Sequence, residues 1–125
     1  MRLLLRLNAL VGVGFGLGLL LIPKPLLDLY GVATTDAIEA VARLYGAELL
    51  GFSVATWLAA DQRSAWRPVL AGHVTNESLT AVVAALVVVT GVAGGLLWSI
   101  VVLAGGFAIA SAMALRATSA VARHE

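Results

Sequence analysis

Residues 3–22 read LLLRLNALVGVGFGLGLLLI, and this stretch decides the class of protein. It is apolar over about 20 residues, the length that an α-helix needs to cross a hydrocarbon core of about 30 Å. Arg6 and Asn8 are the polar interruptions. The stretch therefore predicts a transmembrane helix close to the amino terminus.

Three more apolar segments of similar length follow, at about residues 37–60, 69–90 and 94–115. Pro23 and Pro25 end the first helix, and Thr35 or Asp36 can cap the second. Connections this short make neighbouring helices antiparallel. We expect an all-α, polytopic membrane protein: residues 1–125 form one domain, an up-down-up-down bundle of four transmembrane helices. Residues 25–30, PLLDLY, predict an additional short helix at the membrane surface.

The composition excludes several classes of protein. Hydrophobic residues make up 61% and charged residues 12% of the chain, against roughly 45–50% and 25% in soluble domains. A net charge of +1 gives no field for nucleic acid. The chain has no cysteine, and His73 and His124 form no metal-binding motif. We therefore expect no metal, no cofactor and no nucleic acid, and membrane lipids as partners.

The distribution of basic residues predicts the orientation in the membrane. One side of the bundle collects six arginines, and the other side collects Lys24. The six are Arg2, Arg6, Arg63, Arg67, Arg116 and Arg123. The positive-inside rule then places both termini in the cytoplasm of a multi-pass protein of the cell membrane, in a bacterium the inner membrane. A cleaved secretory signal is disfavoured because no A-x-A site follows the first apolar stretch.

Small residues mark helix faces that can approach another backbone closely. In the first segment they are Gly12 and Gly16, and Gly14 and Gly18, each pair spaced four apart. A similar face in the last segment contains Gly105 with Ala104, Ala108 and Ala112. Such small-xxx-small patterns favour helix packing in membranes. We expect the partner helix to lie within the same chain, although a second chain is the alternative.

Polar residues inside the apolar segments are the candidates for function, because they are costly in a membrane. At about 1.5 Å per residue, Glu48 lies near the midplane and Glu77 in the inner half. The candidate intramembrane polar site comprises Glu48, Glu77, Asn76, His73 and Asn8. We expect Glu48 to approach Glu77 and Asn76, and His73 to approach Asn8 in a second layer.

Spacing along single helices predicts two local pairs. Glu39 and Arg43 are four residues apart with the acid first, which favours a structural ion pair near the outer interface. His73 and Glu77 have the same spacing and can touch. The polar groups could therefore fix helix register, or an intramembrane carboxylate could line a proton, cation or ligand site.

Two resemblances add to this interpretation. Most of the chain, including residues 1–10 (MRLLLRLNAL) and 42–59 (ARLYGAELLGFSVATWLA), resembles small bacterial four-helix membrane proteins of the DoxX-like and DUF4345-like neighbourhood. That likeness implies a four-helix fold, and it allows a quinone-linked role. Residues 42–46 (ARLYG) and 73–77 (HVTNE) are similar to the pattern of the ergosterol-biosynthesis scaffold family. This second similarity implies a role in tethering enzymes. The positions that match the family pattern are Arg43, Gly46, His73 and Glu77.

Three functions follow as hypotheses. The leading one is a non-enzymatic accessory or scaffold subunit of a membrane assembly, which associates with other membrane subunits or with itself. The alternatives are a small oligomeric proton- or cation-coupled transporter that uses Glu48 or Glu77, and a quinone- or lipid-binding enzyme subunit. The sequence shows no recognisable combination of a nucleophile, a general base and a third group that orients the base. An enzymatic function is therefore the less expected class. Substrate, partner and oligomeric state stay open.

Overall fold

The computed structural model describes residues 1–121, which form helices joined by short turns and contain no strand. Its long helices are α1 (Arg2–Leu21), α3 (Asp36–Ala59), α4 (Trp66–Val89) and α5 (Trp98–Val121), and the shorter α2 (Pro23–Leu29) follows α1. Two 3₁₀ turns, η1 (Arg63–Ala65) and η2 (Gly95–Leu97), precede α4 and α5. Arg123 and His124, which entered the predictions above, lie outside the described residues.

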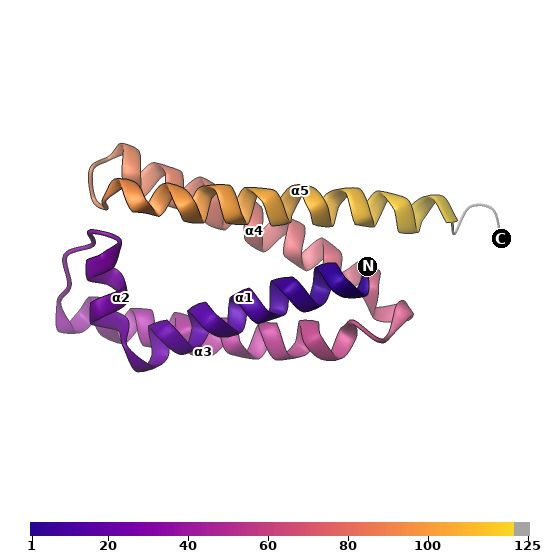
Figure 1. The fold of residues 1–125 in the computed structure, drawn as a ribbon, viewed down its shortest axis with the longest axis horizontal. Helices are drawn as coiled ribbons and strands as arrows, with labels where there is room; N and C mark the ends of the chain where they lie inside the picture. Colours follow the sequence, from indigo (N-terminus) through magenta and orange to yellow (C-terminus); the bar gives the residue numbers. More distant parts are fainter. Residues whose placement is uncertain (122–125) are drawn as a thin grey trace.

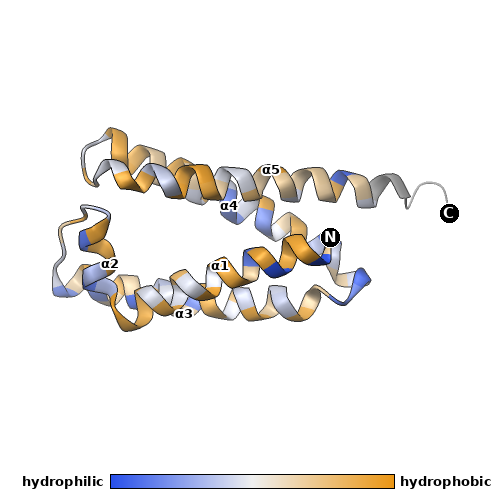
Figure 2. Ribbon diagram, viewed as in Figure 1, coloured by the Kyte–Doolittle hydropathy of each residue, from blue (hydrophilic) through white to orange (hydrophobic). Residues whose placement is uncertain are grey.

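Three segments of the described chain, not four, are long and apolar enough to cross a membrane. They are Arg2–Leu21, Arg63–Val89 and Gly95–Thr118. The expectation of four such segments is wrong for α3. This helix has the required length, but Asp36, Glu39, Arg43 and Glu48 lower its hydropathy. Figure 2 shows the same contrast, with hydrophobic residues along the long helices and hydrophilic ones at the helix ends and in one stretch of α4.

The helices form two antiparallel pairs (Figure 1). The first helix pair is α1 with α3, and the second helix pair is α4 with α5. The two pairs meet near the amino terminus, where Leu5, Ala60 and Leu70 are almost fully buried in one cluster. At the opposite end the amide of Gly94 donates to the carbonyl of Tyr30 over 2.8 Å. Between these two closures the pairs stand apart.

Glycine allows the close crossing within the first helix pair. A Cβ atom added to Gly46 would lie 2.8 Å from the carbonyl oxygen of Gly16, and one added to Gly12 would collide with Ser53. Gly12 and Gly16 therefore face α3 inside the same chain, while Gly18 faces Leu26 of α2. Gly14 and Gly105 pack against no other helix of this chain, because no atom lies within 4 Å of an added Cβ at either position.

Local chemistry explains the helix ends. The Thr35 hydroxyl accepts a hydrogen bond from the amide of Ile38 and caps α3. Helix α4 ends in a Schellman turn with Gly91 at φ 74°, a conformation that favours glycine. Helix α5 begins at Trp98, later than expected, because η2 occupies the preceding residues. The short helix predicted over residues 25–30 is present as α2, which begins two residues earlier, at Pro23.

The two ends of the molecule carry different charges. At the amino-terminal end Asp61 pairs with Arg6 at 3.1 Å and with Arg2 at 3.6 Å. The Arg6 guanidinium also lies over the ring of Trp57. At the other end Lys24 pairs with Asp28 across one turn of α2. All of these charged side chains are about half exposed, so each pair contributes little to stability.

Candidate functional site

A cavity of about 580 Å³ lies between the two helix pairs. This volume falls within the roughly 300–1,000 Å³ of small-molecule sites. Its wall on α4 is one helix face that runs from Glu77 through Thr80 and Val83 to Val87. At 1.5 Å per residue that face is about 15 Å long. The cavity is therefore an elongated slot along the helices.

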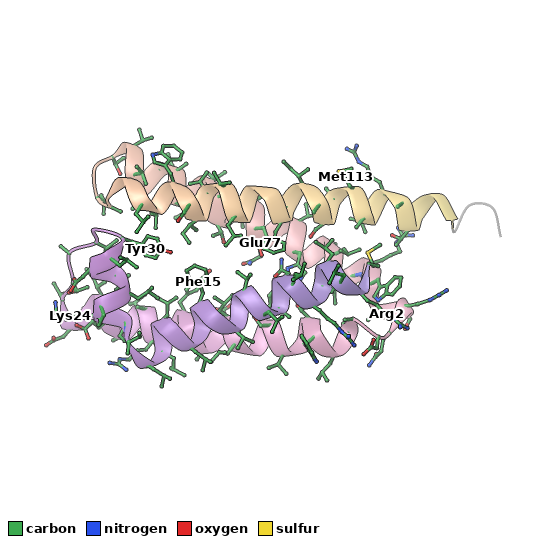
Figure 3. The ribbon with its side chains drawn as sticks, viewed as in Figure 1. Arg2, Phe15, Lys24, Tyr30, Glu77 and Met113 are labelled. Atoms are coloured by element: carbon green, nitrogen blue, oxygen red, sulfur yellow. The ribbon has the colours of Figure 1, made fainter. Side chains whose placement is uncertain are left out.

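The cavity walls contain every phenylalanine and tyrosine of the chain. These residues are Phe15, Tyr30, Tyr45, Phe52 and Phe107. They come from α1, the end of α2, α3 and α5, so the fold gathers them from distant parts of the sequence. Figure 3 shows the Phe15 and Tyr30 side chains in the space between the two helix pairs. The remaining walls are mainly aliphatic, so the slot offers an apolar molecule both rings and methyl groups.

The slot is closed at its ends and open at its sides. The buried cluster of Leu5, Ala60 and Leu70 blocks one end, and the contact of Gly94 with Tyr30 bridges the other. Wall residues between these ends stay exposed: Val41 is 65% exposed and Leu103 38% exposed. A molecule would therefore reach the slot laterally, from between the helix pairs.

Polar groups gather at the end of the slot near the buried cluster. The side-chain amide of Asn8 donates to Oε1 of Glu77 over 3.1 Å, which links α1 to α4. The Nε2 atom of His73 lies 3.0 Å from the Thr56 hydroxyl, which links α4 to α3. The Nδ1 atom of His73 lies 3.8 Å from Oε1 of Glu77. Four side chains thus connect three helices at the polar end of the slot.

Together with Asn8, Glu77 lines the slot (Figure 3). Its side chain is 14% exposed, whereas His73 is 1% exposed and stands behind it. The ring of Phe52 packs on His73 with centroids 4.8 Å apart. Oε2 of Glu77 has no hydrogen-bond partner among the described residues. A ligand in the slot would meet this oxygen.

The predicted site residues divide into two groups in the structure. Asn8, His73 and Glu77 come together, and Asn76 lines the same cavity. Glu48 does not join them: it lies on the exposed face of α3 and has no partner among the described side chains. The expectation that Glu48 meets Glu77 and Asn76 is therefore wrong. Helical rotation explains the error, because Glu48 follows the buried Gly46 by two residues, about 200° around the helix.

The predicted ion pair between Glu39 and Arg43 is also absent from the described residues. Arg43 instead donates from Nη1 to the carbonyl oxygen of Leu20 over 2.8 Å. That carbonyl belongs to the last turn of α1, where carbonyl groups lack partners within their own helix. Arg43 therefore ties α3 to the end of α1.

Several residues of the site carried no recognisable sequence signal. Thr56, the partner of His73, is an ordinary threonine in an apolar segment, and the scattered aromatic residues show no common spacing. Tyr30, which follows α2, lines the slot as well. The one available signal was the scarcity of phenylalanine and tyrosine in so apolar a chain.

The arrangement is suited to binding rather than to metal chemistry. Within residues 1–121 no group of three or more His, Asp or Glu side chains could hold a metal ion. The slot combines apolar walls with a few convergent polar groups, as ligand sites do. Its chemistry matches a mostly apolar molecule that makes hydrogen bonds at one end.

Comparisons with protein-family models, curated proteins and solved structures find no match to this chain. The resemblances drawn from the sequence therefore stay predictions.

Proposed function

We propose that the protein binds an apolar small molecule that enters its slot from the lipid bilayer. The observation that carries this proposal is the cavity of about 580 Å³ whose amide and carboxylate wall groups, Asn8, Asn76 and Glu77, lie toward one end. Lateral openings suit a ligand that is dissolved in lipid, because such a ligand need not cross water. The binding role is non-enzymatic, and it is compatible with an accessory subunit that holds or passes on a lipophilic compound within a membrane assembly.

The proposal includes four membrane crossings, with α3 as the fourth. Helix α3 packs along α1, so a bilayer that α1 crosses also surrounds α3. Arg43 donates a hydrogen bond to the carbonyl oxygen of Leu20, so it lies at about the same depth in the bilayer as the end of α1. Asp36 and Glu39 then lie beyond that level, where charged groups meet water. Glu48 is the one charge of α3 left within the span, which is tolerable in a helix with a partner.

The orientation proposed here places both termini in the cytoplasm. Arg2, Arg6 and Arg63 all lie at the amino-terminal end of the bundle, as the positive-inside rule requires. Because the chain lacks cysteine, single labelling sites can be introduced. In intact cells a membrane-impermeant maleimide should label Thr34→Cys and should leave Gln62→Cys unlabelled until the cells are opened. Labelling of Gln62→Cys in intact cells would contradict this topology.

Ligand binding is tested by filling the slot. Val83 and Val82 are neighbours on α4 and are both 56% exposed, but only Val83 lines the cavity. We expect Val83→Trp to reduce bound apolar compound by about tenfold, since a loss of 1.4 kcal/mol in binding has that effect. The measurement is mass spectrometry of molecules that stay bound to the full chain purified into lipid nanodiscs.

Val82→Trp is the matched control and should retain the compound at the wild-type level. It adds the same indole to the same helix without entering the slot. Equal retention by both variants would count against the proposal. So would an extract from the wild-type protein that contains bulk phospholipid alone.

A further inference from the structure

We propose that the preferred ligand is a lipophilic organic cation with aromatic or alkyl groups. This inference rests on the proposed binding function and names the class of molecule that the slot selects. Three features of the cavity wall support it: the sign of its charge, the free acceptor on Glu77, and the aromatic rings.

The slot has a negative charge and no positive one among its described wall residues. Glu77 is the acidic residue of the wall, and none of the lining residues is lysine or arginine. Arg6, which lies near this end, is paired with Asp61. An anionic headgroup would therefore face a carboxylate of like charge in an apolar setting, which is strongly unfavourable.

His73 makes no hydrogen bond to Glu77 in this geometry. A protonated imidazole needs acceptors at both ring nitrogens. The Nε2 atom meets the Thr56 hydroxyl, but the buried Nδ1 atom has no hydrogen-bond partner. Its distance of 3.8 Å from Oε1 of Glu77 is too long for a hydrogen bond. The Asn8 amide donates to Oε1 of Glu77, so Oε2 stays available as an acceptor for a ligand.

The aromatic wall provides a second attraction for a cation. The faces of phenylalanine and tyrosine rings attract cations, most strongly where water is excluded. All five of these residues in the chain line the slot, and Phe52 stands at its polar end beside His73. A carboxylate among rings is suited to an organic cation that carries apolar groups, whereas a hydrated metal ion would lose its water here.

Two ions of the same shape and opposite charge test the inference. The probes are tetraphenylphosphonium and tetraphenylborate, each measured separately by equilibrium dialysis against nanodiscs that contain the full chain. Empty nanodiscs give the amount that partitions into lipid. We expect saturable binding of tetraphenylphosphonium above that background, and no saturable binding of tetraphenylborate. Equal saturable binding of both ions would overturn the inference.

Two carboxylates of the same chain provide the variant and its control. Glu77→Gln keeps the side-chain size and should weaken phosphonium binding by about tenfold or more. Glu48→Gln makes the same change on the exposed face of α3 and should leave binding unchanged. Wild-type affinity in Glu77→Gln would overturn the inference, and so would an equal loss in both variants.

Failure of this inference can be told from failure of the proposed function. If neither ion binds but Val83→Trp still displaces a neutral apolar compound, the slot binds ligands and the cation preference is wrong. If Val83→Trp displaces nothing and neither ion binds, the binding function itself is wrong.

Discussion

Replacing Leu70 by alanine should lower the free energy of unfolding by about 2–5 kcal/mol, the range seen when a buried leucine is truncated. Leu70 is fully buried and packs with Leu5 and Ala60. These three residues come from α4, α1 and the end of α3, so they join the two helix pairs. Truncation would leave a void where the pairs have few other contacts. The measurement is unfolding in mixed micelles by titration with sodium dodecyl sulfate, followed by circular dichroism.

Leu79→Ala is the control on the same helix. Leu79 is 61% exposed and does not line the slot, so lipid can fill the space that its truncation leaves. Its effect should stay within about 0.5 kcal/mol, as for other exposed sites. Equal destabilisation by the two variants would mean that the helix pairs do not meet at Leu70.

The closure at Leu70 also explains how an open slot persists in a small bundle. The glycine crossing holds α1 against α3, and α4 packs against α5 over its length. Each pair can therefore be stable by itself. The buried cluster and the bond from Gly94 to Tyr30 then fix the separation at both ends. In a membrane the exposed apolar walls between these closures carry no penalty, since lipid tails are as apolar as leucine.

The helices were predictable from the sequence because their lengths and breaks follow local rules. The helix boundaries at Pro23, Thr35 and Gly91 depend on local properties of these residues. Such boundaries do not require particular tertiary contacts. The expected count of four apolar spans was wrong at α3, because the charges of this helix lower its hydropathy. Arg43 and the charges before it lie at or beyond the end of α1, which only the packed structure shows.

The polar site was predictable in part, for a related reason. His73 and Glu77 share a helix face by spacing, and the depth of Asn8 brings it near them. Glu48 was misplaced because the depth of a residue along a helix does not show on which side of that helix the residue lies. The slot itself left no pattern, since apolar residues cover the long helices on all sides and lipid-facing positions resemble ligand-facing ones.

Replacing Gly46 by alanine should destabilise the protein by roughly 1–3 kcal/mol, the usual cost of overpacking. The new Cβ would lie 2.8 Å from both the Gly16 carbonyl oxygen and the Leu20 amide nitrogen. Both of these are backbone atoms of α1, so no side-chain rotation relieves the clash and the helices must separate. Separation would also stretch the nearby bond from Arg43 to Leu20. Detergent unfolding, measured as for Leu70→Ala, gives the change.

Gly51→Ala provides the control, because it makes the same substitution in α3 where no atom lies within 4 Å of the new Cβ. Alanine favours a helix over glycine by up to about 1 kcal/mol, so this variant should be unchanged or more stable. The free energies of unfolding of the two variants should therefore differ by roughly 1–4 kcal/mol. If Gly46→Ala were as stable as Gly51→Ala, α1 and α3 could not cross with their backbones in contact. The slot would then have to be bounded by a different helix arrangement.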